Sequence, residues 1–77
     1  MVTAFVLINV EDMKLQDIRE ELLELSGVAE VHVVAGEYDM VALLRVEDNA
    51  ELSKLLTDRI IHTSGVQRTK TLISLST

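Results

Sequence analysis

Cysteine, proline and tryptophan are absent from this 77-residue chain, and histidine occurs only twice. The lack of cysteine excludes disulfides and thiolate metal sites, and two histidines make a His-rich metal site unexpected. A domain this small buries a modest core, so its stability usually depends on disulfides, a metal or oligomerisation. We therefore expect no metal and no cofactor, and the composition favours oligomerisation.

Basic residues are also scarce. Seven of them stand against thirteen acidic residues, which gives a formal net charge of −6. Such a surface repels phosphate backbones and anionic membranes, so we expect direct contact with neither nucleic acid nor a membrane. No apolar run approaches the roughly 20 residues of a membrane span, and no basic segment precedes an apolar stretch at the N-terminus as in a secretion signal. The expected compartment is the cytoplasm.

The chain repeats a short pattern. Val10-Glu11-Asp12 returns as Val46-Glu47-Asp48, and Ser26-Gly27-Val28 returns as Ser64-Gly65-Val66. Each copy runs through an apolar segment, the acidic turn, an amphipathic stretch and a second apolar segment, and the later copy is slightly longer in its helix. A strand-helix-strand layout used twice predicts a duplicated split β-α-β unit. With no linker-like segment, residues 1–77 form one predicted domain.

Hydrophobic periodicity places the elements. Strands are predicted over residues 3–10, 28–34, 38–46 and 66–75, a first helix from Leu15 to about Leu25, and a second from an N-cap at Asn49 to about Ile61. The first and third strands are apolar on both faces and should be central, whereas the second alternates and reads as an edge. The predicted fold is α+β, a ferredoxin-like βαββαβ sandwich with a four-stranded antiparallel sheet and two helices on one face.

Two helices leave the other face of such a sheet uncovered. The central strands carry apolar residues on each side, among them Phe5, Leu7, Val41 and Leu43. An exposed apolar patch of that size usually marks an interface. We expect the chain to dimerise through the uncovered face; the alternative is a monomer with a somewhat apolar open sheet.

Two motifs in the second half resemble a known family. Gly36-Glu37-Tyr38-Asp39 precedes a two-faced strand, and Gly65-Val66-Gln67-Arg68-Thr69-Lys70-Thr71 leads into the last strand. The pattern resembles the effector-binding (RAM) domain of the leucine-responsive/asparagine regulator (Lrp/AsnC) family. Full-length members carry a helix-turn-helix DNA-binding domain ahead of it, whereas here the first strand follows Met1 at once. The resemblance implies a stand-alone ligand-binding domain with no DNA-binding domain.

That resemblance implies a non-enzymatic, amino-acid-sensing and oligomerisation module linked to transcriptional regulation. The implied partners are a second copy, a ring of dimers, a free amino acid bound at contacts between dimers, and full-length relatives. Asp39 would accept from the ligand's ammonium group, while threonine hydroxyls and backbone amides would bind its carboxylate. The candidate ligand-binding residues are Gly36, Glu37, Tyr38, Asp39, Asn49, Thr69, Thr71, Ile73 and Ser74.

Other interpretations stay open for the same residues. Gly36 and Asp39 can simply build the turn, and Thr69 and Thr71 are ordinary strand formers. A small dimeric α/β-barrel enzyme of monooxygenase or isomerase type, or a purely structural partner of DNA-binding relatives, is the alternative function. His32 and His62 are expected to be surface residues, and no catalytic residue is predicted.

Overall fold

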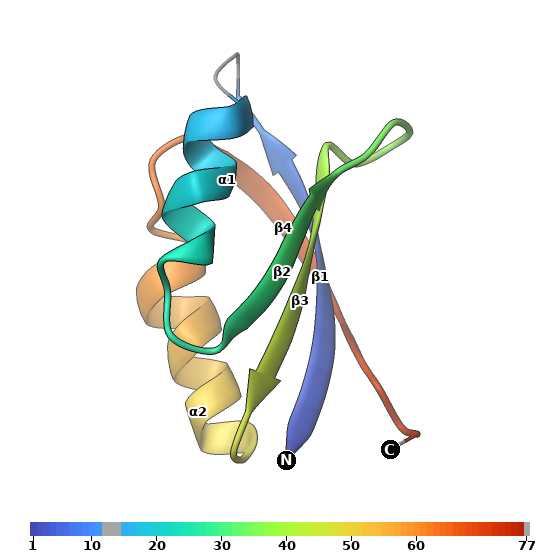
Figure 1. Ribbon diagram of the computed structural model, residues 1–77, viewed down its shortest axis with the longest axis vertical. Helices are drawn as coiled ribbons and strands as arrows, with labels where there is room; N and C mark the ends of the chain where they lie inside the picture. Colours follow the sequence, from blue (N-terminus) through green and yellow to red (C-terminus); the bar gives the residue numbers. More distant parts are fainter. Residues whose placement is uncertain (12–14, 77) are drawn as a thin grey trace.

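The computed structural model describes residues 1–11 and 15–76 and contains one antiparallel sheet with helices on one face (Figure 1). The four strands are β1 (Val2–Val10), β2 (Val28–Val33), β3 (Met40–Val46) and β4 (Val66–Ile73). The helices are α1 (Leu15–Leu23) and α2 (Asn49–Lys54), and α2 continues directly into a π-helix, η1 (Leu55–Ile60). The strand order β2-β3-β1-β4 confirms the ferredoxin-like fold and places β1 and β3 in the centre. Asp12 of the first acidic turn lies outside the described residues.

The core lies between the sheet and the helices. Register places Ala4, Val6 and Ile8 of β1 opposite Leu44, Ala42 and Met40 of β3, and all six side chains are fully buried. The helices contribute a matching set of buried apolar residues, Ile18, Leu22, Leu52, Leu55 and Ile60. These residues are spaced so that they lie on one side of each helix, and that apolar side packs against the sheet.

The opposite face of the sheet has no helix over it (Figure 1). Its centre is apolar: Phe5 pairs with Leu43 and with Leu72, and Leu7 pairs with Val41. Phe5 is 39% exposed and Leu72 is 48% exposed. We call this surface, centred on Phe5, Leu7, Val41, Leu43 and Leu72, the open face. Within one chain the central strands are thus fully buried on the helix side and only partly buried on the open face.

Several predicted boundaries were wrong by one or two residues. The N-cap of α2 is Asp48, whose Oδ1 accepts from the Glu51 amide at 2.9 Å, and Asn49 is the first helical residue. The third strand begins at Met40, because the two residues before it belong to the connection. The last strand ends at Ile73, so Leu75 stands outside the sheet and is 97% exposed.

The π-helix explains how the longer second repeat fits the same core. The Ile61 amide donates to the Leu56 carbonyl at 3.2 Å, an i→i−5 bond. Leu55 and Ile60 are five residues apart, which in an α-helix with 3.6 residues per turn separates them by about 140° around the axis. Wider i→i+5 turns bring such residues nearly into line, and both are buried here. The second helix can therefore be longer than the first and still turn its apolar residues toward the sheet.

Gly27, which follows α1, is one of three glycines with positive φ, and we expect substitution there to be more destabilising than at Gly36. Its φ is +99°, and an added Cβ would lie 2.9 Å from Leu55 Cδ2 and 3.0 Å from Val46 Cγ1, whereas Gly36 has φ +143° and open space around it. We expect Gly27→Ala to lower the free energy of unfolding by about 2–5 kcal/mol, from backbone strain plus overpacking. Gly36→Ala, with strain alone, should cost about 1–2 kcal/mol.

Urea denaturation of both variants at one protein concentration measures these costs. Equal destabilisation of the two would show that the contacts with Leu55 and Val46 do not constrain this turn.

Candidate functional site

The connection between β2 and β3 is fastened to the end of β1. The Val34 amide donates to the Asp39 carbonyl at 2.9 Å, which closes the connection, and the Asp39 amide donates to the Ile8 carbonyl at 2.9 Å. The Asn9 side-chain amide adds a bond to the Glu37 carbonyl at 2.9 Å. Residues 34–39 are therefore held in place by β1 as well as by the two strands that they join.

The Asp39 carboxylate takes part in this fastening. Its Oδ2 accepts from the Val10 amide at 2.9 Å in a partly buried position. The register between β1 and β4 shifts between Asn9 and Val10, so the ladder is irregular at this point. The pairing of β1 with β3 ends at Ile8 and Met40, so the Asp39 side chain satisfies a backbone donor just beyond the last paired residues.

An open groove of about 480 Å³ lies beside this connection. The connection supplies Glu37 and Tyr38, and β4 supplies the run Arg68, Thr69 and Lys70 on the other side. Asn9 at the end of β1 also lines it, because β1 is paired to β4 and bonded to the connection. The groove thus combines one carboxylate, two cations, two hydroxyls and an amide, which suits a small ligand carrying both charges.

Only part of the predicted ligand set meets in this groove. Glu37, Tyr38 and Thr69 line it, Gly36 is exposed in the same connection, and Asp39 is bonded to β1 beside it. Asn9, Arg68 and Lys70 were not among the predicted residues. Arg68 and Lys70 flank Thr69 in the sequence motif, so the sequence could have indicated them. The position of Asn9 beside the groove depends on strand register, which the sequence does not show.

The remaining predicted residues lie elsewhere in the chain. Thr71 lies midway along the edge strand β4, where it pairs with Val6 on the side that faces the helices. Ile73 pairs with Ala4, and the Ser74 amide donates to the Thr3 carbonyl, so both lie near the start of β1. Asn49 follows the far end of β3 from Asp39. One copy of the chain does not bring these four residues to the groove.

A second groove of about 590 Å³ lies on the helix side. It is lined by the turn that follows α1, the end of β3, α2 and η1, and none of the predicted ligand residues contributes to it. Its lining residues are Glu24, Leu25, Ser26, Val46, Glu51, Lys54, Leu55, Asp58 and Arg59. Its lining mixes charged residues of both signs with the apolar residues Leu25, Val46 and Leu55.

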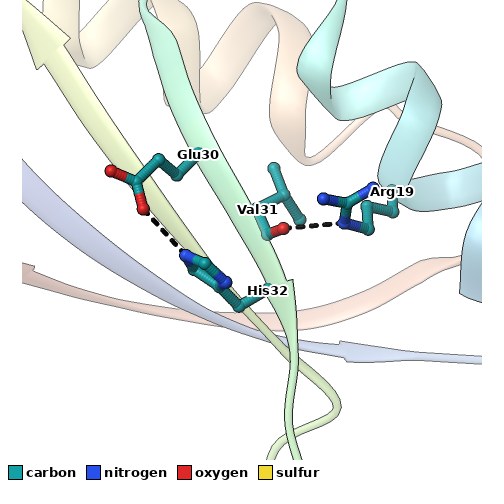
Figure 2. Close-up of polar contacts among 4 residues, drawn as sticks. All are labelled: Arg19, Glu30, Val31 and His32. Atoms are coloured by element: carbon teal, nitrogen blue, oxygen red, sulfur yellow. Dashed lines mark hydrogen bonds and ion pairs between the residues drawn. The ribbon is translucent and has the colours of Figure 1, made fainter.

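Figure 2 shows two polar contacts at the edge strand β2, one with a side chain of α1 and one between two side chains of β2 itself. Arg19 of α1 donates from Nε to the Val31 carbonyl at 2.7 Å. His32 Nε2 lies 2.8 Å from Glu30 Oε1, and both side chains are more than half exposed. His32 is thus a surface residue of the edge strand, as predicted, and lies outside the lining of either groove.

Two further features bear on function. In residues 1–11 and 15–76, no three His, Cys, Asp or Glu side chains are grouped so as to hold a metal ion. Among the described helices, none has the length and apolar character needed to cross a membrane.

Comparison with known proteins identifies relatives over the whole domain. Residues 3–77 match the family model of the Lrp/AsnC ligand binding domain. A crystal structure of a Thermus thermophilus protein is 44% identical with a TM-score of 0.93, covering 100% of this chain and 96% of that one. An uncharacterised HTH-type transcriptional regulator of Pyrococcus furiosus is 33% identical, covering 97% of this chain and 52% of its own length. The chain therefore spans about half the length of the curated relatives it matches.

Some of the similar structures are complexes with an amino acid. The feast or famine regulatory protein from M. tuberculosis, complexed with L-methionine, is 35% identical with a TM-score of 0.84. The match covers 100% of this chain and 52% of that one.

The bond from Val10 to Asp39 predicts different outcomes for two substitutions. Asp39→Ala removes the acceptor of the Val10 amide and should lower the free energy of unfolding by about 1–3 kcal/mol. Asp39→Asn keeps a carbonyl oxygen at the same place and should retain most of that stability. Thermal melts of both variants test this. If the asparagine variant is as unstable as the alanine variant, the contact with Val10 is not what Asp39 contributes.

Proposed function

This chain belongs to the Lrp/AsnC ligand-binding domain family, and we propose that it is a non-enzymatic module that binds a small amino acid and oligomerises in the service of transcriptional regulation. Its curated relatives are transcriptional regulators by name. The observation that carries the proposal is the groove beside residues 34–39, whose lining combines a carboxylate with two cationic side chains.

The groove has the polar groups that a zwitterion requires. An amino acid needs an acceptor for its ammonium and donors for its carboxylate. Glu37 supplies a carboxylate on the connection, and the Asp39 carboxylate beside it is the second candidate. Arg68 and Lys70 supply cationic donors on β4. The L-methionine in the M. tuberculosis relative supports this class of ligand.

The open face supports self-association. It presents the apolar side chains of Phe5, Leu7, Leu43 and Leu72. In a domain this small, leaving such an apolar surface in contact with water costs a large part of the free energy of folding. We propose that a second copy covers it, and that dimers assemble further into a ring with the amino acid at contacts between dimers. Thr71, Ile73, Ser74 and Asn49 would then act from a neighbouring copy or not at all.

A regulatory role also requires a connection to DNA. The net charge of −6 disfavours direct binding to phosphates by this chain. We propose that full-length relatives supply the DNA contact by co-assembling with it, which places the protein in the cytoplasm with its target genes.

Self-association through the open face is testable with one charged substitution. Leu43→Glu places a carboxylate at the centre of the open face and should convert the dimer to a monomer of about 8.6 kDa in light scattering. Ile61→Glu is the matched control, because Ile61 is 47% exposed and lies just after η1, outside the open face. It should leave the dimer intact. A wild-type chain that is monomeric at micromolar concentration contradicts the proposed assembly.

Amino-acid binding is tested first by thermal melts with each of the twenty amino acids at millimolar concentration. A bound ligand stabilises the folded chain by RT ln(1 + [L]/Kd), so at least one amino acid should raise the melting temperature. Calorimetry on Glu37→Gln and Arg68→Gln should then show affinities about ten- to a hundredfold weaker, since each loses a charge-assisted bond. Glu24→Gln, outside this groove, is the control.

The same titration assigns Asp39. Asp39→Asn, which keeps the acceptor for Val10, should lose affinity only if the second oxygen anchors the ammonium. If none of the twenty amino acids shifts the melting temperature, amino-acid sensing is wrong and a purely structural role in assembly becomes the better account.

A further inference from the structure

The two margins of the open face carry opposite charges. Strand β2 presents Glu30 and His32 on this side, and β4 presents Arg68 and Lys70. The pairings place these residues in common rows across the sheet: Glu30 lies in the row of Leu43, Phe5 and Leu72, and His32 in the row of Val41, Leu7 and Lys70. Because side chains alternate along a strand, all of them project to the same face. An acidic edge, an apolar centre and a basic edge therefore run across one surface.

We propose that these charged margins select the partner and its orientation: a second copy of this chain lies on the open face with its β4 over β2, so that Glu30 pairs with Lys70 of the other copy, twice in each dimer. This inference depends on the dimer proposed above. It adds the orientation of the two copies and the residues that set it.

The symmetry of a dimer leaves two ways to stack aligned sheets face to face. If the two-fold axis runs parallel to the strands, β2 of each copy lies over β4 of the other. If the axis runs across the strands, β2 lies over β2 and β4 over β4. The second arrangement sets Glu30 against Glu30 and Lys70 against Lys70. Only the first sets each acidic margin against a basic one.

The side chains can span the distance between two sheets. Packed sheets lie about 10 Å apart, and a glutamate and a lysine reaching toward each other from opposite sides meet within that space. Glu30 and Lys70 belong to adjacent rows, a diagonal offset that long side chains bridge. Glu30 retains a free oxygen for the pair, because its contact with His32 uses Oε1.

The charged margins contribute specificity more than affinity. Margins of this kind add little binding energy but discriminate strongly against wrong partners, because like charges brought together are unfavourable. The apolar centre supplies the association, and the margins decide which surface it accepts.

Charge reversal distinguishes the two arrangements. Without added amino acid, Glu30→Lys and Lys70→Glu should each weaken the wild-type dimer about ten- to a hundredfold, because each creates two like-charge contacts. The double variant Glu30→Lys/Lys70→Glu should return to within about threefold of wild type. The two single variants mixed together should form a heterodimer as stable as wild type. Dimer dissociation constants from analytical ultracentrifugation provide the readout.

Matched controls make the same changes of charge on the helix side. Glu21→Lys on α1 and Lys54→Glu on α2 alter net charge equally, and both residues are exposed. They should leave the dissociation constant within about threefold of wild type. Circular dichroism on each variant confirms that it is folded before its association is measured.

The absence of cysteine allows an independent test of orientation. Glu30→Cys and Lys70→Cys chains, mixed and treated with a short bismaleimide, should give a cross-linked heterodimer, whereas either chain alone should not. Cross-linking within each single variant, or single charge reversals that dimerise like wild type, would overturn the inference while leaving the dimer itself established. A wild-type monomer would instead remove the proposed assembly and this inference together.

Discussion

Two short helices can cover only one face of a four-stranded sheet, and the central strands of this sheet are apolar on both. The helix side reaches full burial at Val6, Ile8 and Leu44, whereas the other side leaves Phe5 and Leu72 substantially exposed. Without disulfides, such a small domain has few other sources of stability. In the proposed assembly a second copy covers the open face, and the apolar area buried there adds to the stability of the fold.

The polar chemistry gathers at one corner of the same sheet. Asp39 and Asn9 hold the connection of residues 34–39 against the end of β1, at the point where the ladder with β4 becomes irregular. This arrangement brings Glu37 and Tyr38 beside Arg68 and Lys70. In the proposed dimer Lys70 lines the groove and also pairs with Glu30 of the other copy at the margin of the interface. Occupancy of the groove would then change the charge that a partner meets, which gives ligand binding a physical route to assembly.

Periodicity and duplication were sufficient to predict the sheet order and the uncovered face, because apolar residues on both sides of a strand require a central position. Local boundaries were less predictable: Asp48 and Asn49 are both good N-caps, and only the bond to the Glu51 amide distinguishes them. The candidate site was predicted only in part. The bond from Val10 to Asp39 and the approach of Asn9 to Glu37 join residues far apart in the chain, and they depend on strand register that no local pattern encodes.

Isotope-filtered NOE spectroscopy on an equal mixture of labelled and unlabelled chains tests the central claim, that a second copy covers the open face. The account predicts intermolecular NOEs from the Phe5 ring to methyl groups of Leu43 and Val41, and none from helix-side residues such as Leu22 and Ile60. Intermolecular NOEs confined to the helix side, or a spectrum with none and the line widths of an 8.6 kDa monomer, would contradict it.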